Sequence, residues 1–245
     1  MNLLERLVMG ALMFWAVVPS ANAGWQTDTL DTSAGDLRIT LIGHGTLMFQ
    51  FGKLVIHVDP VSRYADYATL PKADIILVTH EHGDHLDPKA ISQIRTKDTE
   101  LVLTEACARQ TKSGTVMRNG DVQQVKGLRI EAVPAYNIVH LRGPGQPYHP
   151  KGVGNGYVIT FGRQRVYMAG DTENIPQMTK LAGVDVAFLP MNLPYTMTPE
   201  MVADAARVLK PKILYPYHFG DTDTAKLVAL LKDDHGIDVR IRNMQ

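Results

Sequence analysis

The sequence predicts an α/β protein with a four-layer αββα architecture, in which two β-sheets pack face to face and helices cover their outer faces. Short apolar or alternating runs, which are typical of strands, recur between helical segments, and this succession occurs twice along the chain. Each sheet can then bury one face on the other sheet and the second face under helices. The 245 residues are 45% hydrophobic and 20% charged, so we expect one globular domain with a large core.

The N-terminus has the pattern of a bacterial secretory signal peptide. Arg6 precedes the apolar run 7–18, which is too short to span a bilayer comfortably, and Ala21-Asn22-Ala23 matches the small-x-small cleavage pattern. We expect cleavage after Ala23, which leaves a single domain of residues 24–245, periplasmic or secreted, with no stable membrane anchor. The alternative is an uncleaved anchor.

The first half of the expected fold begins after a polar leader at 25–34. A β-meander comes first, and a strand, two helices and further strands follow it. Asp87 is a good N-cap for the first helix, because Pro88 occupies the first helical position. The expected helices are 88–95 and 105–112, and the expected strands are 37–42, 46–51, 53–58, 75–78, 101–103, 122–125 and 128–134.

The second half begins after a long loop at 135–152 that is rich in glycine and proline, and loops of this length are often functional. Thr198-Pro199-Glu200 is a strong helix start, with an N-cap, a proline and then an acid. The expected helices are 199–209 and 223–231, and the expected strands are 156–161, 164–168, 184–189, 212–215 and 237–242.

Four residues of metal-ligand type follow a buried strand within one short segment. His80, His82, Asp84 and His85 form an H-x-H-x-D-H pattern, and imidazole and carboxylate groups are the usual ligands of a divalent ion such as zinc. His80 and His82 project to one side if the chain stays extended, and Gly83 permits a sharp turn that points the other two back. The segment thus offers ligand pairs to two neighbouring ions. The alternative is a solvated acidic loop with incidental histidines.

The segment Thr79 to Asp87 resembles the signature of the metallo-β-lactamase superfamily, and the resemblance extends from about Leu37 to Arg242. It is closest to the branch of ascorbate-phosphate lactonase-like and N-acylphosphatidylethanolamine phospholipase D-like enzymes. The resemblance implies the αββα fold and a pair of divalent ions, two zinc ions with manganese or iron as alternatives, at one edge between the sheets.

The resemblance also implies the ligands of both ions. Asp171 follows a strand and a glycine turn, and it is similar to the family's bridging aspartate, which holds both ions at once. His218 lies at another strand end and matches the last histidine ligand. By this resemblance the second ion is held by Asp84, His85, Asp171 and His218, and the first by His80, His82, Asp171 and one loop residue.

That loop residue is where the sequence departs from the family pattern. The place of the third histidine of the first site is taken by Asn137, a weaker neutral ligand. His140 or His149 offers an imidazole from further along the loop, and His149 is favoured because the residues around it make the chain rigid. The alternative is that both histidines are exposed loop residues.

Further residues are expected beside the ions. In the resembled branch a histidine at the place of His44 lies close to the metal site, and the counterpart of Asp59 orients a metal-bound histidine. A simple turn aspartate is the alternative for Asp59. Tyr136, Tyr148 and Tyr195 are candidates for lining a pocket, although aromatic loop residues commonly just pack.

Three residues with reactive side chains are given structural roles. Cys107, the only cysteine, lies in a helical stretch, so we expect a packed thiol and no internal disulfide. His57 lies within a strand and His235 in a terminal loop, and we expect both to be structural or solvated.

These features predict a metal-dependent hydrolase that uses metal-activated water on a small ester, lactone, amide or phosphoester. Asp84 or Asp171 is expected to orient the water. The alternatives are a metal- or ligand-binding protein that has lost catalysis, suggested by Asn137, and a metal-dependent nuclease. The formal net charge is zero, which leaves no basic excess for nucleic acid, so we expect a small-molecule substrate.

Overall fold

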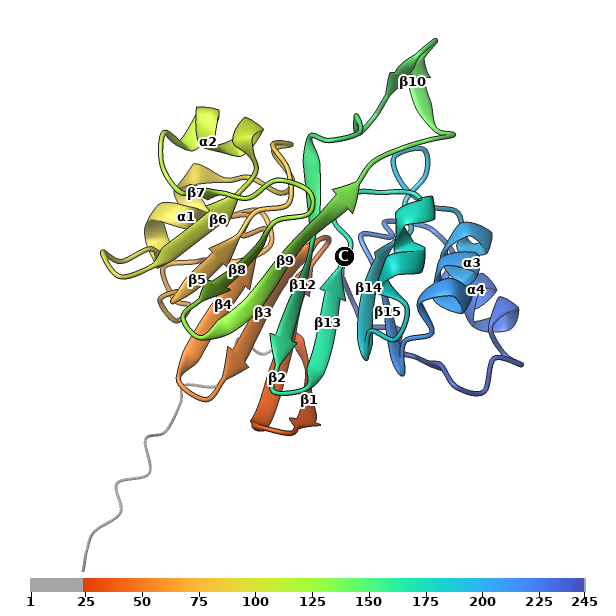
Figure 1. Cartoon of the computed structure of the whole chain (residues 1–245), viewed down its shortest axis with the longest axis horizontal. Coiled ribbons are helices and arrows are strands. Elements are labelled where there is room, and N and C mark those ends of the chain that lie inside the picture. The colour runs from red at the N-terminus through yellow and green to blue at the C-terminus, as the bar shows by residue number, and fades with distance from the viewer. Residues whose placement is uncertain (1–23, 245) are drawn as a thin grey trace, which may run out of the picture.

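The computed structural model describes residues 24–244 and contains two seven-stranded sheets packed against each other, with helices on both outer faces (Figure 1). The predicted four-layer αββα class is confirmed. The signal peptide expected at 1–23 lies outside the described residues. Within the described part of the chain, every helix is too short or too polar to cross a membrane.

The first sheet contains the strands in sequence order. Its first four strands are antiparallel, and the last three continue parallel to the fourth. The strands are β1 (Gln26–Thr32), β2 (Gly35–Gly43), β3 (Thr46–Phe51), β4 (Leu54–Val58), β5 (Ile75–Leu77), β6 (Glu100–Leu103) and β7 (Thr115–Val116).

Helices α1 (Pro88–Ile94) and α2 (Glu105–Thr111) cover the outer face of this sheet. The two faces follow from the alternation along β5, because Ile75 and Leu77 belong to the core between the sheets whereas Ile76 packs with the helices. Cys107 is buried in that outer layer, as expected, and burial raises its pKa to about 11.

The polar leader expected at 25–34 is wrong, because this segment forms β1 and the turn into β2. Asp28 on β1 ties the strand to the C-terminal segment, since Arg242 Nη2 donates to its carboxylate at 2.8 Å. Partial burial opposes ionisation of Asp28, but the hydrogen bonds from Tyr215 and Arg242 lower its pKa. The leader is therefore held by contacts with residues more than 180 positions away, which a local pattern does not show.

The second sheet differs from the prediction in its membership. The sequence predicts that the strands at 122–125 and 128–134 belong to the first half, but they lie at one side of the second sheet, where β9 (Leu128–Ala135) pairs antiparallel with β12 (Gly154–Phe161). The strand order is β16 (Asp238–Val239), β15 (Ile213–Tyr217), β14 (Val186–Pro190), β13 (Gln164–Met168), β12 (Gly154–Phe161), β9 (Leu128–Ala135) and β8 (Val122–Val125).

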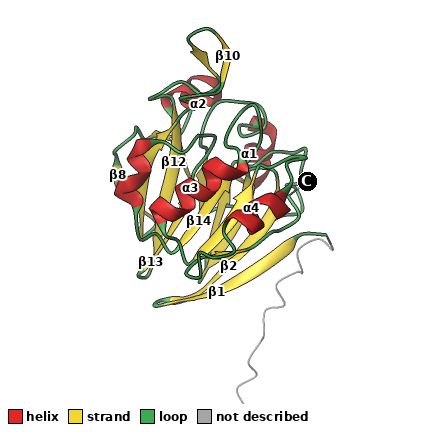
Figure 2. Cartoon of the chain, turned by 90° about the vertical axis from the view of Figure 1, so that its right-hand side faces the viewer, coloured by secondary structure: helices red, strands yellow, loops and turns green. Residues whose placement is uncertain are grey.

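The outer face of the second sheet carries the 3₁₀ helix η1 (Pro176–Leu181) and the helices α3 (Pro199–Leu209) and α4 (Thr224–Leu230) (Figure 2). Helix α3 begins where the sequence predicts, because Thr198 Oγ1 accepts the backbone N–H of Met201. The final strand covers two residues of the expected range 237–242. The long loop contains a projecting hairpin of β10 (Leu141–Gly143) and β11 (Gln146–Pro147) (Figure 1).

The fold directs five strand ends to one edge. Parallel strands β4 and β5 of one sheet, and β13, β14 and β15 of the other, each end in a loop at this edge. Polar residues at the carboxyl ends of such strands come close together in space. The loops that follow these five strands carry Asp59, His80, Asp171, Asn192 and His218.

Candidate metal centre

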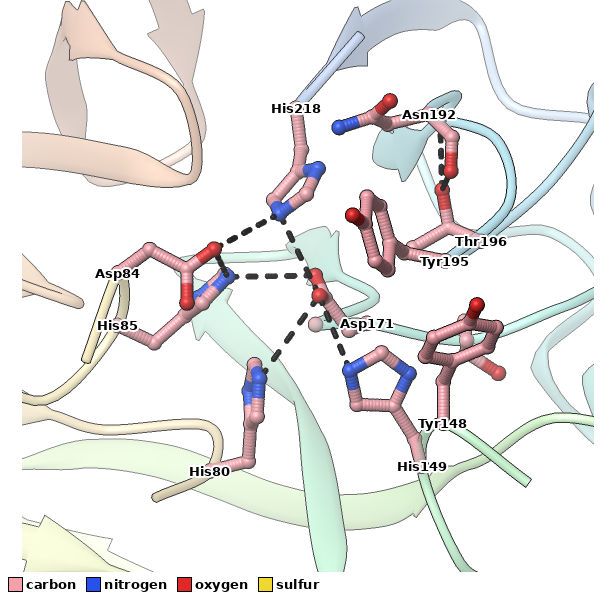
Figure 3. Close-up of polar contacts among 12 residues, drawn as sticks. His80, Asp84, His85, Tyr148, His149, Asp171, Asn192, Tyr195, Thr196 and His218 are labelled. Carbon is pink, nitrogen blue, oxygen red and sulfur yellow. Dashed lines mark hydrogen bonds and ion pairs between the residues drawn. The ribbon is translucent and has the colours of Figure 1, made fainter. Parts of the chain in front are cut away.

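The structure gathers all six residues predicted as metal ligands, together with His149 and His44, at this edge. Figure 3 labels all of them except His44 and His82. Their ligand atoms form three overlapping groups, and the atoms within each group lie within 4.8 Å of one another. The groups are His80, His82 and His149; His44, Asp84, His85 and His218; and His80, His85 and Asp171.

The first group contains three imidazoles. His80 and His82 come from the loop after β5, and His149 comes from the loop that leads from the hairpin into β12. The ring of His149 lies 5.1 Å from that of His80 and 4.9 Å from that of His82, measured between centroids. Three histidines in this arrangement form a typical set of ligands for zinc.

The second group surrounds Asp84. Oδ2 of this carboxylate lies 3.1 Å from Nε2 of His44 and 3.7 Å from Nε2 of His218. The rings of His44 and His218 are in contact, with centroids 3.6 Å apart. Burial opposes ionisation of Asp84, but its interactions with His218 and His44 lower its pKa, so that it is a carboxylate at neutral pH.

Asp171 lies between the two groups. Its Oδ2 is 3.2 Å from Nε2 of His149 and 3.3 Å from Nε2 of His218, and its Oδ1 is 3.3 Å from Nε2 of His85. The side chain is only 4% exposed. Gly170, with φ of 64°, makes the turn that places it there, and a Cβ at this glycine would lie 2.8 Å from a backbone oxygen. One carboxylate thus faces both groups of ligands.

Several polar atoms at the centre of the cluster have no hydrogen-bond partner among the described residues. Buried polar atoms in proteins are nearly always paired, and an unpaired one costs about 1–3 kcal/mol. Divalent cations would satisfy all of them at once, so the side chains present fit the predicted metal ions. These atoms are Nε2 of His80, His85 and His218 and Oδ1 of Asp171.

Hydrogen bonds fix the tautomers of two of these histidines. Asp59 Oδ2 accepts a hydrogen bond from Nδ1 of His85 at 2.7 Å. The Thr79 hydroxyl donates to the same carboxylate, and so it accepts from Nδ1 of His80 at 3.0 Å. In both rings Nδ1 carries the proton and Nε2 is free to bind a metal ion. Burial lowers the pKa of His80, which favours the neutral ligand form.

Asp59 therefore lies where the family resemblance places it, beside a candidate ligand. Its carboxylate also accepts the backbone N–H of Thr79 at 2.7 Å, so that it joins the end of β4 to the loop after β5. Burial disfavours the imidazolium form of His85, but the carboxylates of Asp171 and Asp59 outweigh it and raise the pKa of His85 to about 9.

The sequence left open which loop residue supplies the third ligand of the first group. In the structure His149 presents its imidazole there, and Asn137 holds His149 in place. The amide nitrogen of Asn137 donates to Glu173 Oε1 at 3.1 Å and to the backbone oxygen of Tyr195 at 2.9 Å. Its oxygen is thereby turned toward His149, where it accepts from the backbone N–H at 2.8 Å and from Nδ1 at 2.7 Å. Nε2 of His149 then points at Asp171. The structure thus gives Asn137 the place of a support for His149.

Glu173 is a residue that the sequence reasoning missed. Its buried carboxylate accepts backbone N–H groups of Ile138, Val139 and His140, each at 2.7 Å, and Nδ1 of His140 at 2.8 Å. Burial opposes its ionisation, but these hydrogen bonds and the one from Asn137 lower its pKa. His140, predicted beside the ions, is held here instead. The one signal for Glu173 in the sequence was its position two residues after Asp171.

His44 contacts the cluster through a strained turn. Its φ is 53°, and its ring stacks on Tyr64 with centroids 5.4 Å apart. The following residue, Gly45, leaves room for the cluster, because a Cβ there would lie 2.7 Å from Cε1 of His85. Loop 43–45 is thus shaped to bring His44 against Asp84 and His218.

A cleft of about 490 Å³ opens directly onto the cluster. Tyr148, Tyr195 and Asn192 lie on one side of the candidate ligands (Figure 3), and Arg142 from the hairpin also lines the cleft. Tyr136, grouped with these tyrosines by sequence, is buried, and its hydroxyl donates to Gln177 at 2.9 Å. It is absent from the lining because its ring lies inside the fold. The buried His57, by contrast, has the structural role expected of it.

Comparison with known proteins identifies relatives over most of the chain. The sequence profile described as "Beta-lactamase superfamily domain" matches residues 38–218. A UPF0173 metal-dependent hydrolase of Pelotomaculum thermopropionicum is 30% identical over 193 residues, which cover 75% of this chain and 84% of the relative. A protein of the same description from Thermus thermophilus is 32% identical over 194 residues, with the same coverage.

Solved structures agree with this result. A candidate metal-dependent hydrolase from Parabacteroides distasonis shares 53% sequence identity, with a TM-score of 0.86 over 90% of this chain and 100% of that chain. Igni18, described as a metallo hydrolase from Ignicoccus hospitalis, is 22% identical with a TM-score of 0.71 over 85% of this chain and 95% of its own. The second likeness concerns the fold alone.

Proposed function

Because this chain belongs to the beta-lactamase superfamily and is a metal-dependent hydrolase, we propose that it uses two divalent ions to hydrolyse a small ester, lactone, amide or phosphoester. Zinc is the ion that we expect in both sites, with manganese or iron as alternatives. The observation that carries the proposal is the position of Asp171, whose carboxylate lies within 3.3 Å of Nε2 of His149 from the first group and of His85 and His218 from the second. Two ions that share a bridging carboxylate are a recurrent arrangement in hydrolases.

We assign the ligands from the three groups. His80, His82 and His149 would hold one ion, Asp84, His85 and His218 the other, and Asp171 both. When bound, such ions lower the pKa of water and polarise the carbonyl or phosphoryl oxygen under attack. Asp59, Thr79 and Asn137 contact Nδ1 of His85, His80 and His149, and so they orient each ring with Nε2 toward the place that the ions would take.

Asp84 is the better candidate for orienting the attacking water. Both carboxylates line the cleft, but the side chain of Asp84 is 43% exposed, whereas that of Asp171 is 4% exposed and enclosed by histidines. His44 Nε2 donates to Asp84 Oδ2, which leaves the other carboxylate oxygen to accept a hydrogen bond from water. Both predicted catalytic carboxylates thus keep a role, but the roles differ because the two side chains differ in exposure.

The size of the cleft supports a small-molecule substrate, since about 490 Å³ is in the usual range of ligand pockets. We also propose that the protein acts in the periplasm or outside the cell, supported by the signal-peptide pattern of residues 1–23. The alternative of a protein that has lost catalysis rested on Asn137, which takes the place of a histidine ligand. His149 can supply that imidazole, so this reason no longer applies.

The test begins with metal content. Protein purified without added metal is assayed by elemental analysis, loaded with zinc, manganese or iron, and incubated with a panel of esters, lactones, amides and phosphoesters. We expect two ions per chain and turnover that a His80→Ala, His82→Ala double variant loses. The exposed His235, changed to alanine, is the matched control and should behave as the parent. Fewer than one ion per chain, with no turnover on adding metal, would favour a binding protein.

A further inference from the structure

We propose that the substrate is a small organic anion, whose carboxylate or phosphate group pairs with Arg142 at the mouth of the cleft while its apolar body packs against Tyr148 and Tyr195. The inference rests on the proposed function, because it concerns the same cleft. It adds the chemical class of the molecule that enters and the residue that selects it.

Arg142 is presented to the cleft by the hairpin. It lies on β10, and the register Leu141↔Pro147 brings Tyr148 close to it across the hairpin. Arg142 Nη2 donates to the backbone oxygen of Tyr148 at 3.0 Å, and the guanidinium lies 5.4 Å from the centroid of the Tyr148 ring. The contacts hold the side chain on the wall of the cleft although it is exposed.

The guanidinium keeps unused hydrogen-bonding capacity. Its contacts in the described part of the chain are the carbonyl and the ring of Tyr148, and no ion pair found there includes it. A guanidinium has five N–H donors in a planar fork that matches a carboxylate or phosphate. It is the single lysine or arginine among the described residues that line the cleft.

The charge at the bottom of the cleft has the same sign as Arg142 once ions are bound. Two divalent cations exceed the charge of Asp84 and Asp171, the two carboxylates that line the cleft. A third positive group at the mouth therefore raises the positive potential of the cleft, which attracts anions and repels cations. The anionic group of the substrate would sit at the mouth and its reactive group at the ligand cluster.

Two tyrosine rings form the aromatic part of the wall, beside Asn192. Tyr148 and Tyr195 are in edge-to-face contact with centroids 5.1 Å apart, and Tyr195 is 44% exposed. Exposed large apolar side chains also occur nearby in the sequence, in segments 138–141 and 193–195, although they are not among the residues that line the cleft. These side chains are Ile138, Val139, Leu141 and Leu193. An aromatic or other flat apolar body fits this wall.

The experiment compares two esters that differ in one charge, 4-acetoxybenzoate and 4-acetoxybenzamide, on the zinc-loaded full-length protein. A third ester, 4-acetoxyphenylphosphonate, tests a phosphate-like anion against the carboxylate. We expect a KM about tenfold lower for the preferred anion than for the amide, the size typical of one charge-assisted hydrogen-bonded pair.

The variants are Arg142→Gln, Arg142→Lys and the control Arg163→Gln, which changes an exposed arginine in the β12–β13 turn. Arg142→Gln should abolish the preference through KM, Arg142→Lys should keep part of it, and the control should keep all of it. An undiminished preference in Arg142→Gln would show that the anion binds the metal ions directly and would overturn the inference. So would equal KM values for anion and amide in the parent protein.

A binding measurement separates the inference from the hydrolase proposal. Calorimetry with 4-hydroxybenzoate and 4-hydroxybenzamide needs no turnover. If none of the esters is hydrolysed but the acid still binds more tightly than the amide in an Arg142-dependent manner, hydrolysis of aryl acetates is excluded and the anion site stands. If the esters are hydrolysed and the acid shows no such dependence, the reaction class stands and the anion site is wrong.

Discussion

Replacing Asn137 by alanine tests how the metal centre is built. The variant removes the acceptor of His149 Nδ1–H and of its backbone N–H, and also the donor to Glu173 and to the Tyr195 carbonyl. With four hydrogen bonds at about 0.5–1.5 kcal/mol each, partly replaced by water, we expect a loss of about 2–4 kcal/mol of unfolding free energy.

The effect on metal binding should be selective. His149 would no longer be held in the tautomer that leaves Nε2 free, and loss of such a supporting group typically costs about 10–100-fold in metal affinity. The other ion, near Asp84, His85 and His218, keeps its surroundings. We therefore expect Asn137→Ala to retain one ion after dialysis against a weak chelator, where the parent protein retains two. Elemental analysis and competition with a chromophoric chelator measure the difference.

Asn155→Ala provides the matched control. Asn155 is as buried as Asn137, and its side chain also makes several hydrogen bonds, to the Met117 carbonyl at 2.8 Å, to the Tyr157 hydroxyl at 3.3 Å and from Asn119 at 2.7 Å. It should lose a similar amount of stability and keep both ions. If Asn137→Ala binds two ions with the affinity of the parent, the support assigned to this amide is wrong.

Three further outcomes follow from single contacts. Asp59→Asn weakens the acceptor of His85 Nδ1–H, so kcat/KM of the metal-loaded enzyme should fall about 10–100-fold; an unchanged value would contradict this role. Asp28→Asn should cost about 1–2 kcal/mol at pH 7 in denaturant titrations. Because folding lowers the pKa of Asp28, this contribution is fully present above the unfolded value of about 4 and decreases as the pH falls from there through the lower folded value; a difference of the same size at pH 7 and at pH 3 would exclude the ion pair with Arg242. Cys107, whose pKa burial raises to about 11, should be alkylated by iodoacetamide at pH 8 far more slowly in the folded than in the unfolded chain, and mass spectrometry would reveal equal rates if the thiol were accessible.

The strands and helices near the site were largely predictable because their signals are local. The apolar run before His80 is a strand, and the Asp87 and Thr198 caps start helices where their side chains accept the first N–H groups. The assignment of strands to sheets was less predictable. Strand β9 joins the second sheet by pairing with β12, between residues 19 to 31 positions apart, and β8 follows by pairing with β9. No pattern within segment 122–134 records that choice.

By itself the sequence determined the class of chemistry, since four ligand-type side chains within six residues after a buried strand have few other uses. It also determined that carboxylate and imidazole follow later strands, at Asp171 and His218. Only the tertiary structure decided which loop residue completes the first group and why Asn137 is where it is. The physical reason is that these roles depend on hydrogen bonds between residues 12 and 36 positions apart, so that the donor or acceptor which sets a side chain's orientation lies outside any local pattern.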